Sequence, residues 1–523
     1  MSLGEMMFIR YGSCERKGSC GRKILALAIF LGVSAASVVP AIAQENTSRV
    51  SLASVDSQTQ AALTHALKLD LQKYIDNHMG RLWDQEKQIL VNSVSVSGKG
   101  ELIVDLSKGF LPPKPARIEE NRRDQMKELY VEVIDPVLSV DFRNAPVIFT
   151  FDGRSMEEVQ PEDPTLKPKK KIRASIVEPK NVVISASHGL FYNHGNKRWE
   201  YQRPDKWNGI IEDLLTPSHV VELAALVTTR SEDDVYEPRT RSTTINSTTK
   251  RPWWEMAARY NLERVYPGRT DIWGVTASPN DPMREYNKDI NSRPRYANEV
   301  GADALISLHT NGSKTNPNAR GTWVLVRTDR PTDYALGQSI LCAMKEQIHA
   351  VPAYADYHVD EAPRESDAYG ENSGFPDIKK VVVETGFHTN VDDAAALQDP
   401  VFITAAMKGV EKGYRLDRDG VTCAPFKITS IPNVTFTYGS GLQKTPIVIQ
   451  GSPRYPIAYK SEITSCSGSC NGATKTIADA SGLTMDFTCR PGGSATLSAK
   501  LKATMTDADQ VVSAYEHSVT CKK

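Results

Sequence analysis

Apolar residues are spaced differently in successive parts of the chain, and each spacing predicts a different kind of domain. Between residues 45 and 165, Leu63, Leu67 and Leu71 recur at helical spacing, whereas residues 146–151 alternate as in a strand. This mixture predicts a small α+β accessory domain. Its polar residues have no catalytic spacing, so we interpret the region as a substrate-binding or spacer module.

The pattern changes after a Pro- and Lys-rich stretch at residues 166–178. Its like charges repel one another and its prolines resist packing, so we interpret it as a linker. From residue 179 to 416, short apolar runs such as 305–308 and 381–383 alternate with helical segments. This alternation predicts a central α/β domain with a largely parallel sheet. In such folds the functional groups gather at the carboxyl ends of the strands.

The last hundred residues differ again in composition. Residues 424–523 are rich in Ser, Thr and Gly and alternate over short runs, as at 434–438 and 445–449. This pattern predicts an all-β, sandwich-like accessory domain. The predicted fold is therefore multidomain, with the α/β domain preceded by an α+β domain and followed by a β domain.

The N-terminus predicts export. Basic residues precede an apolar run at 24–39 and the small-residue site Ala41-Ile42-Ala43, so residues 1–43 have the organisation of a secretory signal peptide. The apolar run is shorter than the ~20 residues that a membrane helix needs. No later run is longer, and we expect a mature chain without a transmembrane segment, either periplasmic or secreted.

Charge composition and cysteine content restrict the partners and the covalent structure that we expect. Basic and acidic residues are equal at 63 each, so no global charge attracts nucleic acid and we expect no nucleic-acid partner. Six cysteines follow the signal peptide, an even set for which disulfides are the default in an exported protein. Cys489 could join Cys521 and Cys466 could join Cys470, although a metal site is the alternative for the second pair.

Candidate functional side chains follow the apolar strands of the central domain. His188, His309 and Glu384 come directly after such runs, and Glu212 lies just ahead of a helix that we expect to begin at Pro217. Catalytic zinc takes three nitrogen or carboxylate ligands, and hydrolysis needs a further carboxylate to move the proton. These four residues meet both requirements, although the sequence has no His-Glu-x-x-His motif.

Four separated motifs contain these candidate residues. They are Ser187-His188-Gly189, Asn208-Gly209-Ile210-Ile211-Glu212-Asp213, Ile306-Ser307-Leu308-His309-Thr310-Asn311 and Val383-Glu384-Thr385-Gly386-Phe387-His388-Thr389-Asn390. In order and chemistry they resemble the motifs of zinc-dependent N-acetylmuramoyl-L-alanine amidases of the Amidase_3 type. Arg293 and the Gly301-Ala302-Asp303 segment also resemble the sequence that leads into the second histidine strand. The resemblance extends from about residue 181 to residue 414.

This resemblance implies a function for each motif. His188, Glu212 and His309 would be the Zn²⁺ ligands, Glu384 the catalytic acid/base, and the fold a twisted sheet flanked by helices. The bond cut would join the lactyl group of N-acetylmuramic acid to L-alanine, so the partners would be peptidoglycan or muropeptides.

Two insertions depart from the family pattern. The first lengthens the path from His188 to Glu212 and leaves Glu200 as a rival third ligand. The second, at residues 241–291, carries several aromatic residues. We expect these aromatics to pack in the core, and a lid or sugar-stacking wall is the alternative. They are Trp253, Trp254, Tyr260 and Trp273.

Three functions remain open from the sequence. The leading hypothesis is an exported murein amidase with one zinc ion. A peptidoglycan endopeptidase or carboxypeptidase would keep the metal and cut a different bond. A non-catalytic wall-binding protein with an amidase-like fold is the third, but a degenerate site usually loses a ligand or the acid/base first, and all four candidates are present.

Overall fold

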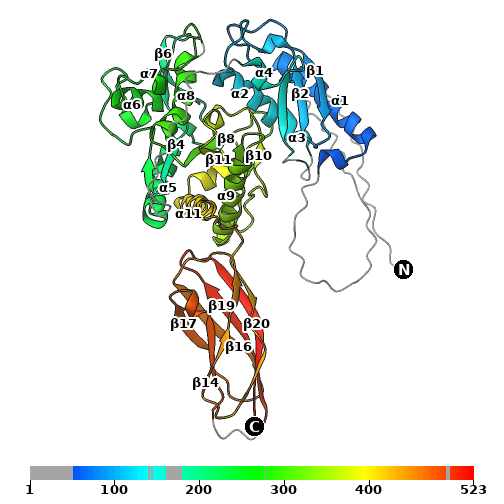
Figure 1. The fold of residues 1–523 in the computed structure, drawn as a ribbon, viewed down its shortest axis with the longest axis vertical. Helices are drawn as coiled ribbons and strands as arrows, with labels where there is room; N and C mark the ends of the chain where they lie inside the picture. The colour runs from blue at the N-terminus through cyan, green and yellow to red at the C-terminus, as the bar shows by residue number, and fades with distance from the viewer. Residues whose placement is uncertain are drawn as a thin grey trace, which may run out of the picture. The chain divides into compact units, whose positions relative to one another are not determined.

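The computed structural model describes residues 51–138, 142, 145–160, 166, 179–276, 278–490 and 495–523 (Figure 1). The predicted signal peptide lies outside these residues, as does the predicted linker apart from Leu166. In the described part of the chain no helix is both long and apolar enough to cross a bilayer.

The N-terminal region combines helices with a small sheet, as its mixed pattern predicts. Strands β1 (Val91–Val96), β2 (Leu102–Leu106) and β3 (Val147–Phe151) form the sheet, in which β1 and β2 are antiparallel and β2 and β3 are parallel. Helix α1 (Ser57–Asn77) begins at an Asp56 cap and packs against β1. Helix α2 (Glu120–Leu129) continues into a π-helical turn, η3 (Tyr130–Ile134).

The central region contains a mixed sheet with helices on both faces. The strands, in spatial order, are β10 (Arg364–Glu365), β9 (Trp323–Val326), β11 (Lys379–Phe387), β8 (Ala304–Asn311), β4 (Asn181–Ala186) and β7 (Asp234–Tyr236). Only the β9–β11 pair is antiparallel, so the sheet is largely parallel. Its strands are buried on both faces, which explains their continuous apolar runs.

The two faces of this sheet carry different helices. Helices α5 (Glu212–Leu226), α9 (Pro331–His349) and α11 (Pro400–Arg418) share a core with Ile184 and Ile306. Helix α8 (Arg284–Glu299) packs on the opposite face, against Val183 and Leu305. Successive side chains of a strand point to opposite faces, so His309, four residues after Leu305, points to the α8 face.

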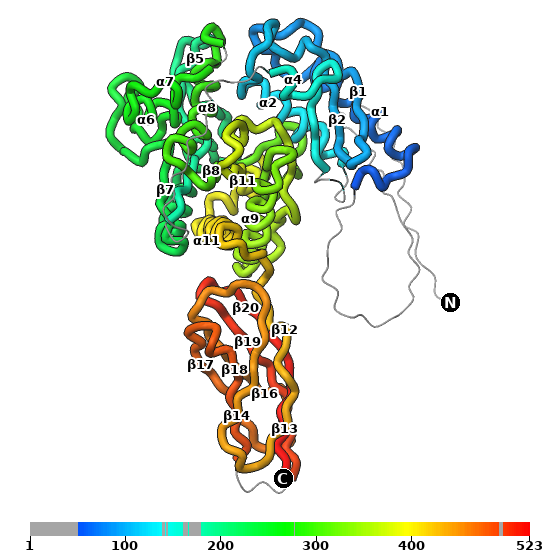
Figure 2. Tube along the Cα trace, viewed as in Figure 1, coloured from blue at the N-terminus to red at the C-terminus, as the bar shows by residue number. Residues whose placement is uncertain are grey.

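Glycines allow α11 to lie very close to α9 (Figure 2). A Cβ added at Gly409 or Gly413 would lie 2.4 Å from the Cα of Met344 or Ile340, respectively. Separations this short exclude any side chain, so the two backbones touch directly. This contact holds α9 and α11 together in the helical layer that covers the sheet face opposite α8.

The N-terminal region shares a hydrophobic core with the central sheet. Leu129 and Phe149 belong to the same buried cluster as Trp323, Val382 and Phe387. Helix α2 also contacts α8. The N-terminal region is therefore bound to the sheet face on which His309 lies.

From Lys427 onward the described residues form strands and one short 3-10 turn. A five-stranded sheet has the order β13-β20-β19-β16-β17, and two pairs of strands, β12–β15 and β14–β18, lie outside it. The strands are β12 (Lys427–Ser430), β13 (Val434–Thr437), β14 (Leu442–Pro446), β15 (Val448–Gln450), β16 (Ile457–Cys466), β17 (Ala473–Ile477), β18 (Thr484–Thr488), β19 (Leu497–Thr506) and β20 (Val512–Lys522).

All six cysteines after the predicted signal peptide form disulfides. Cys466 joins Cys470 and Cys489 joins Cys521, the two pairs that the sequence suggested. The third disulfide joins Cys342 of α9 to Cys423, just before β12. It connects the central region to the start of the C-terminal β region.

Candidate metal centre

The loop that carries His188 is held against the start of α5. His188 follows β4, and Gly189 has a φ of +115°, a conformation that favours glycine. A Cβ at Gly189 would also lie 2.7 Å from the backbone of Ala257. The Asp213 carboxylate accepts hydrogen bonds from the backbone N–H groups of Gly189 and Gln202, at 2.7 and 2.9 Å. These hydrogen bonds to Asp213 hold the His188 loop beside the first turn of α5.

Glu212 is the first residue of α5, so the expected helix start at Pro217 is wrong. A proline inside a helix has no N–H to donate to the carbonyl four residues earlier. For Pro217 this is the carbonyl of Asp213. Arg239 Nη2 donates to that carbonyl at 3.1 Å. This tertiary contact satisfies the carbonyl that Pro217 leaves free, and the helix begins five residues before Pro217.

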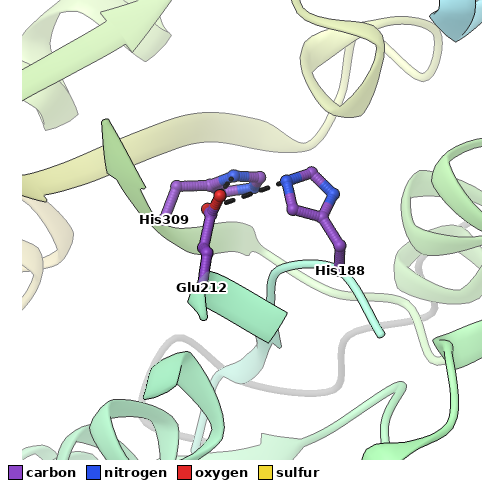
Figure 3. A group of neighbouring side chains, drawn as sticks. All are labelled: His188, Glu212 and His309. Carbon is purple, nitrogen blue, oxygen red and sulfur yellow. Dashed lines mark ion pairs between the residues drawn. The ribbon is translucent and has the colours of Figure 1, made fainter. Parts of the chain in front are cut away.

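Three side chains converge at the carboxyl ends of β4 and β8 (Figure 3). Glu212 Oε1 lies 3.7 Å from His188 Nε2 and 3.3 Å from His309 Nδ1. The two imidazole rings are nearly perpendicular, with centroids 4.7 Å apart. His188, Glu212 and His309 are 2, 4 and 1 % exposed. One ligand atom from each residue lies within 4.8 Å of the others, so all three could contact a single ion.

The unsatisfied polar atoms of this cluster fit a metal ion. Both ring nitrogens of His188 and Nδ1 of His309 are buried and have no hydrogen-bond partner among the described residues. Buried polar atoms usually have partners, so three unpaired nitrogens around one carboxylate need an explanation. Two imidazoles and a carboxylate are a ligand set that zinc accepts.

Glu384 lies beside His309 because the two residues are paired in register on β11 and β8. Paired residues of adjacent strands point to the same face, so the Glu384 carboxylate belongs to the same site. It is 1 % exposed, and its Oε2 has no hydrogen-bond partner in the described part of the chain. An unpaired carboxylate oxygen beside a metal-binding cluster is suited to accept a proton.

Burial and neighbouring charges shift the pKa values of these groups in different directions. Burial, followed by the charge of Arg203, lowers the pKa of His188 well below its usual range. Burial would also lower the pKa of His309, but the carboxylates of Glu371 and Glu212 outweigh it and raise that pKa to about 9. Burial raises the pKa of Glu384 against the opposing charges of Lys127 and His309.

Two charged residues of the site could not be identified from the sequence. Lys127, on α2, places its Nζ 3.6 Å from Glu384 Oε1, although the sequence indicated no catalytic spacing in the N-terminal region. Glu371, on the turn η8 (Gly370–Asn372), places its Oε1 3.1 Å from His309 Nε2. Neither residue lies in a motif, and only the folded chain brings them together.

Glu200, the rival ligand, lies outside the cluster. Its carboxylate accepts hydrogen bonds from Asn193, Asn196 and Arg198 on and around the hairpin of β5 (Leu190–Asn193) and β6 (Arg198–Tyr201). The metal-capable group contains Glu212 instead.

The aromatic residues of the second insertion mostly pack against arginines. Arg259 lies over the rings of Tyr260 and Trp273, and Arg264 lies over Trp253. Trp254 lines an apolar cavity beside α5. All four aromatics are half-buried and none belongs to the buried core, so the expected core packing holds only in part.

Residues 274–414 match the family model Amidase_3, described as N-acetylmuramoyl-L-alanine amidase. The chain thus carries a domain of the amidase class, as the sequence motifs indicated, and the match supports a peptidoglycan amidase. His309 and Glu384 lie within the matched residues, whereas His188 and Glu212 precede them.

Similar solved structures are also amidases. The CwlD amidase from Clostridioides difficile, solved with the GerS lipoprotein, is 15% identical with a TM-score of 0.31, over 46% of this chain and 99% of that chain. Ami1 from Mycobacterium smegmatis is 16% identical with a TM-score of 0.30, over 46% of this chain and 97% of its own. No curated protein sequence matches the chain significantly.

Proposed function

We propose that this chain is an exported, zinc-dependent N-acetylmuramoyl-L-alanine amidase. It hydrolyses the amide between the lactyl group of N-acetylmuramic acid and L-alanine in peptidoglycan. The observation that carries the proposal is the convergence of His188, Glu212 and His309 on one point, beside Glu384, in a region that overlaps the amidase family match. A wall-binding protein without catalysis would have no need of this arrangement.

The roles of the four residues follow from their chemistry. His188, Glu212 and His309 would hold the metal, and a bound zinc ion supplies Lewis-acid chemistry that acidifies water and polarises a carbonyl. Glu384 takes a proton from the attacking water and returns it to the leaving nitrogen. Its raised pKa suits a group that must both accept and donate that proton. Lys127 pairs with Oε1 and leaves Oε2 for the proton.

Export is supported by the cysteines. Three disulfides use all six cysteines after the predicted signal peptide, and such bonds persist in oxidising compartments. A periplasmic or secreted protein would also have access to peptidoglycan. The proposal therefore places the enzyme and its substrate in the same compartment.

Product analysis on purified sacculi tests the function. The full chain should release free stem peptides that begin with L-alanine and leave N-acetylmuramic acid unmodified, and a chelator should abolish this release. Cleavage only within the stem peptide would replace the amidase proposal with an endopeptidase or carboxypeptidase. Absence of any product, together with absence of bound zinc, would support the wall-binding alternative.

A further inference from the structure

The two ring nitrogens of His309 face different partners. Nδ1 lies 3.3 Å from Glu212 Oε1, on the side of the candidate metal, and has no hydrogen-bond partner among the described residues. Nε2 lies 3.1 Å from Oε1 of Glu371, a buried carboxylate that no sequence motif contains. The ring therefore separates the candidate metal from Glu371.

We propose that Glu371 is a positioning residue that selects Nδ1 of His309 as the metal-binding atom. A carboxylate can only accept a hydrogen bond, so the Nε2 that faces it must carry the proton. A histidine must be neutral to bind a metal, so metal-bound His309 has a single N–H, and the lone pair of Nδ1 is then left for the metal. Histidines that bind metals commonly donate their other N–H to such a carboxylate, which fixes the ring. This inference rests on the proposed zinc site.

Arg293 holds Glu371 in place and connects it to a second ligand. This fully buried guanidinium donates to Glu371 Oε1 at 2.6 Å and to Asp289 Oδ2 at 2.9 Å. It also donates to the backbone carbonyl of His188 at 3.2 Å. One cation therefore fixes both the carboxylate that orients His309 and the backbone that carries His188.

The geometry separates this role from direct metal binding. Glu371 lies outside the group of residues whose ligand atoms converge within 4.8 Å, which are His188, Glu212 and His309. Its Oε1 is already shared between His309 Nε2 and Arg293 Nη1. A glutamine at this position would keep an oxygen that can accept both hydrogen bonds, whereas alanine would keep neither.

Zinc affinity of the full chain, measured by competition with a chromophoric chelator, tests the inference without reference to activity. We expect Glu371→Ala to weaken zinc binding by about 10- to 100-fold and Glu371→Gln to recover most of it. Glu346→Gln is the matched control, because Glu346 of α9 is a buried carboxylate that pairs with Lys412 of α11, in the helical layer on the sheet face opposite His309. Its zinc affinity should equal that of the wild type.

The outcomes distinguish this inference from the proposed function. If the wild type bound no zinc, or if His309→Ala bound it equally well, the zinc site itself would be wrong. Normal affinity in Glu371→Ala, or an equal loss in Glu371→Gln, would overturn the positioning role alone. Nitrogen NMR of the zinc-loaded, ¹⁵N-histidine-labelled wild type gives a second measurement that needs no variant: Nε2 of His309 should carry the proton, and a protonated Nδ1 would refute the inference.

Discussion

Replacing Glu384 with glutamine removes the proposed proton carrier while it preserves the size and shape of the side chain. The carboxylate is 1 % exposed and its Oε2 has no partner in the described part of the chain, so little else is lost with the charge. A general acid–base group contributes about 10²- to 10⁴-fold to a rate. This corresponds to about 3 to 5 kcal/mol of barrier. We therefore expect kcat on sacculi to fall by about 10²- to 10⁴-fold.

The same substitution should have a small effect on stability. Lys127 Nζ lies 3.6 Å from Glu384 Oε1 and would lose its counter-charge, but the Lys127 side chain is 18 % exposed and can still reach water. We expect a loss of about 1 kcal/mol in the free energy of unfolding. Zinc content should be unchanged, because His188, Glu212 and His309 remain.

The assay is release of stem peptide from sacculi at saturating substrate, with zinc content and thermal unfolding measured on the same samples. Glu411→Gln is the matched control, because Glu411 is a fully buried carboxylate that pairs with Arg415 on α11. Its kcat should equal that of the wild type. If Glu384→Gln kept more than about a tenth of wild-type kcat while it bound zinc and folded normally, Glu384 would not be the proton carrier.

Three further predictions concern charge, covalent structure and packing. Lys127→Met removes a cation that lowers the pKa of Glu384, so that pKa should rise further. The acid limb of the pH profile of kcat/KM should then move to higher pH. An unchanged pH profile would contradict this. Replacing both Cys342 and Cys423 with serine opens a loop of 81 residues. The free energy of unfolding of the central region, measured in denaturant, should fall by up to about 4.5 kcal/mol. A change below about 1 kcal/mol would count against the loop-entropy model. Gly413→Ala should lower the melting temperature by several degrees, because its Cβ would lie 2.4 Å from the α9 backbone, and an unchanged melting temperature would show that the helices can separate without cost.

Much of the central fold could be predicted from the chain because its strands are buried on both faces. Such strands appear as continuous apolar runs, and their alternation with helical segments indicates a largely parallel sheet. The order of the four motifs similarly led to the amidase family, which the family match confirms. The roles of His188, Glu212, His309 and Glu384 as ligands and proton carrier stay predictions, although the structure brings all four to one place.

The start of α5 is one point at which local rules led to the wrong prediction. Proline is favoured in the first turn of a helix, and this preference placed the start at Pro217. The preference assumes that no other group compensates for the missing N–H. Arg239, distant in the sequence, donates to the freed carbonyl of Asp213, and the helix extends back to Glu212.

By itself, the sequence determined the order of the elements, the candidate quartet and the family, because these depend on hydrophobic period and local motifs. Tertiary structure decided which additional charges enter the site. The α2 sequence is polar enough for a solvent-exposed helix, yet most of it is buried and Lys127 faces Glu384. Glu371 reaches His309 from an irregular turn without any periodic signal. Contacts of this kind depend on how distant segments pack, and no spacing along the chain encodes them.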